Sequence, residues 1–253
     1  IYQNIDSIGH LAIISTVFVL IVVCFYFSYK KAQPFSIQET KFESPIYNYV
    51  VLTGIILTCI FFGYIQFQYE IFGSDYRLVS LFSALASFIV AYFFDNRMAL
   101  SIGLTTLTTF IGITLTPNKI FENEFVSNPV LLFSGIALGV LLVVWIIYSE
   151  KERLKKHFHF VFYTFAQHLI GICCLSGLFQ DQWYLFLPVF VGFIYYFHKW
   201  SYSYFSPSFF DFTLLYGFIG FNVLLIKFID NSSLFEFLIM FSPFYVIGSI
   251  VLF

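Results

Sequence analysis

The sequence predicts an all-α protein, a polytopic transmembrane helix bundle of about nine spans. Only 10% of its 253 residues are charged and 60% are hydrophobic, with a mean hydropathy of +0.87. A soluble globular chain averages about 25% charged residues. One soluble core could not hide this much apolar surface, so lipid is the expected solvent. The 38 Phe and 18 Tyr residues suit lipid-facing and interfacial positions.

Apolar runs of spanning length recur along the whole chain. A helix needs about 20 residues to cross a hydrocarbon layer of about 30 Å. Helices are expected because backbone groups in lipid must be satisfied within the segment, and the runs lack the alternation of a β-barrel strand. The nine runs are 9–29, 46–68, 76–94, 98–116, 129–148, 158–179, 183–199, 207–228 and 234–253.

A short polar stretch, 148–157, sets the predicted orientation. It holds four of the chain's 12 Lys and Arg residues within six positions. Nine of the 12 fall in the connections after spans one, three, five and seven, and three fall in the others. Basic residues in short loops favour the cytoplasmic side. We therefore expect a common cytoplasmic side for loops 30–45, 95–97, 149–157 and 199–206.

The connections are too short to form a separate domain. We therefore expect residues 1–253 to form a single transmembrane helical domain, and we find no convincing internal repeat. The sequence begins at Ile1 without Met and stops at Phe253 inside an apolar run. On that basis we expect a fragment of a longer chain, with one further span before Ile1.

Charge and motifs exclude several function classes. A net charge of −2 leaves no basic face for nucleic acid. The cysteines lie inside apolar runs without CxxC spacing, so we expect them to be packing residues. We expect no cofactor and no metal. No nucleophile elbow, phosphate loop or HExxH motif marks a catalytic residue.

Three histidines, His157, His159 and His198, fall at the predicted cytoplasmic ends of spans six and seven. A metal site is one interpretation of this grouping. We favour exposed interfacial histidines, because neither a carboxylate nor a cysteine completes a recognised ligand spacing.

Several motifs resemble one family. They are IYQNIDSIGH at 1–10, KKAQPFS at 30–36, GYIQFQYE at 63–70, AYFFDNRMALS at 91–101 and GITLTP at 112–117. They resemble bacterial polytopic inner-membrane proteins known only by a domain of unknown function, most firmly over the first half of the chain. The resemblance implies a helix bundle in the bacterial inner (plasma) membrane and a small soluble N-terminal segment outside this sequence. It implies no catalytic residue.

Small and hydroxyl side chains form stripes on three spans, where we expect tight helix packing. A Thr-lined permeation path is the alternative. Span one lacks such a stripe and is expected to be peripheral and lipid-facing. The stripes are Ser80, Ser83, Ala84, Ser87 and Ala91 on span three, Ser101, Thr105, Thr108, Gly112 and Thr116 on span four, and Gly135 and Gly139 on span five.

A candidate intramembrane polar site combines spans six and eight. Thr164, Gln167 and His168 share one face of span six by helical spacing. Asp211 and Asn222 are three turns apart on span eight. We expect His168 to point inward and to make a structural hydrogen bond; transfer of protons or contact with a substrate is the alternative.

The favoured function is a non-catalytic accessory, scaffold or sensing component of a membrane complex. Its expected partners are membrane lipids and other membrane proteins. A small-solute or ion transporter with a path between spans six and eight is the first alternative. The second is a membrane enzyme acting on a lipid-linked substrate, which needs a polar cleft at one interface with at least two convergent ionisable groups.

Overall fold

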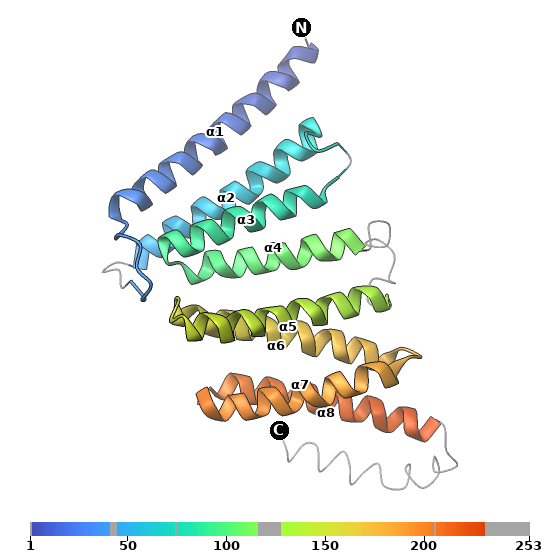
Figure 1. Cartoon of the computed structure of the whole chain (residues 1–253). Helices are drawn as coiled ribbons and strands as arrows, with labels where there is room; N and C mark the ends of the chain where they lie inside the picture. Colours follow the sequence, from blue (N-terminus) through green and yellow to red (C-terminus); the bar gives the residue numbers. More distant parts are fainter. Residues whose placement is uncertain (1, 41–44, 74, 116–127, 205, 231–253) are drawn as a thin grey trace. The chain divides into compact units, whose positions relative to one another are not determined.

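A computed structural model describes residues 2–40, 45–73, 75–115, 128–204 and 206–230 (Figure 1). Within these ranges the chain is all-α, as predicted, with eight α-helices and one short 3₁₀ helix. The elements are α1 Tyr2–Lys31, α2 Pro45–Tyr69, α3 Arg77–Phe94, α4 Arg97–Leu115, α5 Pro129–Lys151, η2 Lys156–Phe158, α6 His159–Phe179, α7 Trp183–Tyr204 and α8 Pro207–Asp230.

Seven of these helices are long and apolar enough to cross a membrane, so the chain is an integral membrane protein in contact with lipid. The prediction of nine spans is not shown. Helix α7 is long enough, with 22 residues, but Tyr, His, Lys and Trp in its second half make it less apolar. The ninth predicted span, 234–253, lies outside the described residues.

Proline marks where three of the helices begin. Pro45, Pro129 and Pro207 are the first residues of α2, α5 and α8. Proline suits this position because the first amide has no partner inside the helix and the proline φ is already helical. At α5, Asn128 precedes the proline, and its side chain accepts a hydrogen bond from the Val130 amide at 3.0 Å.

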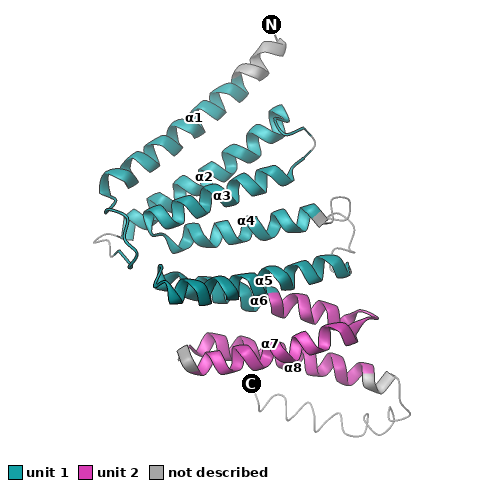
Figure 2. Ribbon diagram, viewed as in Figure 1, with its two compact units in different colours: residues 1–169 teal, residues 170–253 magenta. Residues whose placement is uncertain are grey.

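The chain divides into two compact units, residues 1–169 and 170–253 (Figure 2). In the first unit, α1 packs on α2, α2 on α3, α3 on α4 and α4 on α5. In the second unit, α7 packs on α8. The prediction of a single domain over 1–253 stays a prediction.

The lipid-facing role predicted for span one is supported by its exposure. Only 6% of the span within α1 is buried, the lowest share of the seven spans. Large apolar side chains such as Leu11, Phe18 and Val22 are exposed. Lipid is the solvent that such a surface requires.

The small-residue stripe of α3 is buried, as predicted, except at its first member, Ser80, which is half-buried. Ser83, Ala84, Ser87 and Ala91 lie inside the first unit. Gly135 and Gly139 of α5 are buried as well. Small side chains let neighbouring helices approach closely in a membrane.

The prediction for α4 holds only in part: Gly112 is buried, Ser101 and Thr108 are half-buried, and Thr116 lies outside the described residues. Thr105 is exposed and donates a hydrogen bond to the Ser101 carbonyl one turn earlier, at 2.9 Å. A threonine hydroxyl satisfied within its own helix needs no neighbour. The buried face also contains Gly103, where a Cβ would lie 3.1 Å from the Phe88 ring of α3.

Candidate functional site at the loop end of the first unit

The two-residue connection between α3 and α4 is fixed by its own backbone and side chains. Asp95 has φ 54°, in the left-handed region that Asp tolerates better than most residues. The Asn96 amide donates back to the Ala91 carbonyl at 3.0 Å, closing the end of α3. The Asn96 side chain then accepts a hydrogen bond from the Ala99 amide at 2.9 Å, at the start of α4.

Asp95 connects three loops through four donors. Its Oδ2 accepts hydrogen bonds from the backbone amide and the hydroxyl of Thr40, each at 2.6 Å. Its Oδ1 accepts from His157 Nε2 at 2.6 Å and lies 3.0 Å from Lys155 Nζ. We call these four residues (Thr40, Asp95, Lys155 and His157) the Asp95 cluster. They join segment 32–40, the α3–α4 connection and the α5–α6 loop.

Lys155 is buried and makes three contacts, with Asp95, Ile37 and Phe35. Its side chain is 2% exposed, its amide donates to the Ile37 carbonyl at 2.9 Å, and its Nζ lies 5.2 Å from the centre of the Phe35 ring. A cation over an aromatic face gains electrostatic attraction. Like Asp95, it has a positive φ, 44°. Both partners of the buried ion pair therefore have a left-handed backbone conformation, which costs about 1–3 kcal/mol for each residue. Such a conformation persists only where surrounding contacts enforce it.

The electrostatics of the Asp95 cluster favour an ionised carboxylate. Burial by itself would raise the pKa of the Asp95 carboxyl. The hydrogen bonds from His157, Thr40 and Lys155 outweigh burial and hold this pKa well below its usual range. Since an ionised carboxylate can only accept, His157 Nε2 carries the proton of their hydrogen bond.

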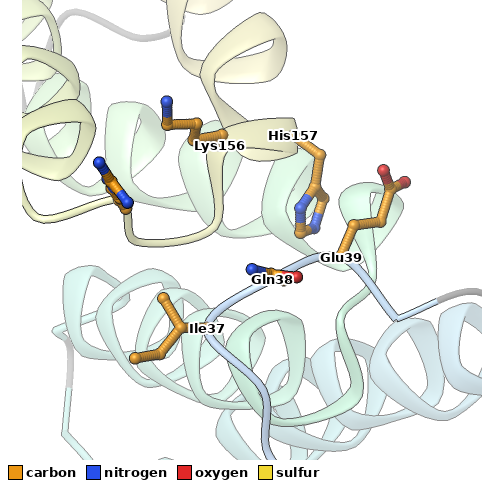
Figure 3. Close-up of a pocket in the computed structure, with 6 residues that line it drawn as sticks. Ile37, Gln38, Glu39, Lys156 and His157 are labelled. Atoms are coloured by element: carbon orange, nitrogen blue, oxygen red, sulfur yellow. The ribbon is translucent and has the colours of Figure 1, made fainter.

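Two polar pockets adjoin the cluster. One, of about 420 Å³, is lined by Ile37, Gln38, Glu39, Arg153, Lys156 and His157 (Figure 3). The second, of about 440 Å³, is lined by residues of segment 39–40, by Asn48 and by residues 95–98. Glu39 borders both pockets and forms an exposed ion pair with Arg97 at 2.7 Å. Ionisable side chains thus converge on one end of the first unit.

Two of the predicted interfacial histidines are not exposed. The His157 side chain is 6% exposed and is bound to Asp95. His159 is buried, and its Nε2 lies 2.7 Å from the Ser149 hydroxyl. The prediction failed because a distant carboxylate, Asp95, gives His157 a buried partner. His198, in the second unit, is exposed.

Metal binding finds no support in the described part of the chain. Within those ranges, no three His, Cys, Asp or Glu side chains are grouped so as to hold an ion. The four cysteines have free thiols, and Cys173 and Cys174 are buried.

The residues of the predicted intramembrane site fall in different units. In the first unit, Thr164 donates to the Phe160 carbonyl of its own helix at 2.8 Å, Gln167 is buried and His168 is half-buried. In the second unit, Asp211 is exposed, and Asn222 donates to the Phe218 carbonyl of its own helix at 2.7 Å. A path shared by these residues stays a prediction.

Sequence reasoning missed Asp95 as the organising residue. A usable signal was present: 95–97 is one of the four loops expected on the cytoplasmic side, so Asp95 is an acid on the same side as most of the basic residues. An acid next to several basic loops is expected to pair with one of them. The choice of Lys155 and His157, 60 or more positions away, required the fold.

Comparison with known proteins identifies no relative of this chain. No protein-family model matches it, no curated protein matches it, and no solved structure matches its fold. The fold and composition define a polytopic helical membrane protein, and the resemblance to one bacterial family stays a prediction.

Proposed function

We propose that the protein is a non-catalytic integral membrane protein that serves as an accessory, scaffold or sensing component of a membrane complex. One observation supports this proposal: both oxygens of the Asp95 carboxylate accept hydrogen bonds from donors on two other loops. A carboxylate engaged in this way cannot act on a substrate without releasing the loops. Its role is to hold the shape of the surface that they form.

A surface held in one shape favours recognition. Loops that are already ordered lose less conformational entropy when a partner binds. Around the buried Asp95 cluster, Gln38, Arg97 and Glu152 are exposed and available for contacts. We propose other membrane proteins as partners and, following the family resemblance, the bacterial inner membrane as the location.

Site-specific photo-crosslinking in native membranes tests this function. A crosslinking amino acid is placed at the exposed positions Gln38 and Glu152 of the loop end, and at the exposed Ile71 beyond the far end of α2 as a control. We expect a discrete adduct of constant mass from the first two positions and none from Ile71. Absence of an adduct from both loop positions would overturn the scaffold proposal.

A membrane enzyme acting on a lipid-linked substrate is the second candidate, because the pocket of about 420 Å³ gathers Glu39, Arg153, Lys156 and His157. Recognition is better supported than catalysis there. His157 Nε2 is engaged by Asp95, and the Glu39 carboxylate pairs with Arg97. Turnover of a lipid-linked substrate that disappears in Glu39→Gln would favour the enzyme instead.

A further inference from the structure

The pocket beside the Asp95 cluster lies between two loops. Segment 37–39 forms one wall and residues 153–157 form the other. In Figure 3 the ring of His157 points toward segment 37–39, with Gln38 and Glu39 beside it. The Lys155 amide bonds to the Ile37 carbonyl at 2.9 Å, so the two walls are tied together. The pocket is therefore a consequence of the same contacts that hold the loops.

No acid among the described residues forms an ion pair with the two basic side chains of this pocket. These side chains, Arg153 and Lys156, are both exposed. The acid at the pocket, Glu39, is engaged by Arg97. The Gln38 amide adds an uncharged hydrogen-bond donor. Two free cations and an amide donor suit an anion with several acceptor oxygens, such as a phosphate group.

The pocket wall also has an unused polar atom. His157 Nδ1 is buried and has no hydrogen-bond partner within the described ranges, whereas Nε2 is bound to Asp95. A buried polar atom usually finds a partner in protein, water or ligand. With the proton on Nε2, Nδ1 can accept a hydrogen bond but has none to donate to a phosphate oxygen, so recognition of an anion here depends on the basic side chains.

The surroundings of the pocket suit a lipid. The α5–α6 loop joins two candidate spans, Pro129–Lys151 and Lys156–Phe179, so it lies where the lipid headgroups begin. On the facing segment, Phe35 is 60% exposed and Ile37 is 53% exposed. Exposed apolar side chains next to basic ones are typical of surfaces that contact the membrane interface.

We propose that the pocket lined by Gln38, Arg153, Lys156 and His157 binds the phosphate group of an anionic membrane lipid. Recognition comes from charge-assisted hydrogen bonds from Arg153 and Lys156 to the phosphate oxygens. Phe35 and Ile37 contact the acyl region. This site is independent of the proposed scaffold role, because it requires no protein partner.

The test measures lipid binding to the delipidated full chain in mild detergent by thermal shift and native mass spectrometry. The probes are phosphatidylglycerol, phosphatidylcholine and inorganic phosphate. The site variant is Arg153→Gln with Lys156→Gln. The matched control is Lys30→Gln with Lys31→Gln, which removes the same charge from the end of α1. Both variants change exposed residues, so their melting temperatures without lipid should equal that of the wild type.

We expect phosphatidylglycerol to raise the melting temperature and phosphatidylcholine to leave it unchanged. The site variant should bind phosphatidylglycerol about tenfold more weakly or worse, since each basic residue near an anionic headgroup contributes substantially to attraction. The control variant should bind like the wild type. Equal weakening in both variants indicates non-specific charge attraction and overturns the proposal. So does equal binding of the two lipids.

Inorganic phosphate distinguishes a lipid headgroup from a soluble phosphate group, which offer the pocket the same oxygens. With a lipid site, we expect phosphate to bind far more weakly than phosphatidylglycerol. If phosphate alone produces the full thermal shift and the site variant abolishes it, the pocket recognises a soluble phosphate group. That result would overturn the proposal that the pocket binds a lipid.

Discussion

Asp95 and His157 lie 62 positions apart in the sequence and are joined by a hydrogen bond of 2.6 Å between Oδ1 and Nε2. Both side chains are buried, at the point where α3 turns into α4 and α5 leads into α6. Within the first unit, this contact joins the α3–α4 connection to the α5–α6 loop. The stability of these two connections should therefore depend on this one carboxylate.

Removal of the Asp95 carboxylate should be costly. Asp95→Ala leaves Lys155 and His157 without their acid, and an uncompensated buried charge typically costs about 3–5 kcal/mol. The matched control is Glu39→Gln, which breaks the exposed pair with Arg97 and should cost about 0–1 kcal/mol. Melting temperatures in mild detergent provide the comparison. Equal losses in the two variants would contradict a special role for Asp95.

Acid should weaken the wild type through Asp95. The pKa of its carboxyl is lower in the folded protein than the unfolded value of about 3.9. The carboxylate thus contributes its full stability above about pH 4, and this contribution is lost as pH falls through the lower folded pKa. We expect the melting temperature of the wild type to fall more steeply between about pH 4 and pH 2 than that of Asp95→Asn. Other carboxyls titrate in both proteins, so parallel curves would refute the assignment.

The all-α fold and most of the spans could be predicted from the sequence because lipid imposes both span length and helical hydrogen bonding. The buried stripe of α3 followed from the small size of Ser83 and Ala84. The stripe of α4 was predicted only in part: Gly112 is buried, but Thr105 is exposed, which its hydroxyl tolerates because it bonds within its own helix. The Asp95 cluster was out of reach, since a pair such as Asp95 and Lys155 leaves no local pattern in the sequence.

His168 provides a test of the predicted intramembrane site. The structure places it half-buried in α6. If its role is a structural hydrogen bond, His168→Gln should keep the stability close to that of the wild type, whereas His168→Leu should lower the free energy of unfolding by about 1–3 kcal/mol. A proton-carrying role predicts a different pattern, in which both variants lose cellular function and both keep the stability of the wild type.

The predicted orientation can be tested by cysteine labelling in a Cys-free variant. Lys155 is unsuitable as a label because its side chain is buried. Glu152 on the α5–α6 loop and Ile71 beyond α2 are both exposed. The positive-inside rule predicts that an impermeant reagent added to intact cells labels Ile71→Cys and spares Glu152→Cys. Labelling of Glu152→Cys alone would show that the orientation is the opposite of the predicted one.

The most direct test of the Asp95 cluster is a double-mutant cycle in Asp95→Asn and His157→Gln, measured as free energies of unfolding in mild detergent. Residues in direct contact show coupling of about 0.5–3 kcal/mol, while independent sites add to within about 0.3–0.5 kcal/mol. We predict that the double variant loses less stability than the sum of the two single variants, by about 1 kcal/mol or more. Additive losses would show that the two loops are not joined through Asp95 and His157, and would contradict the account.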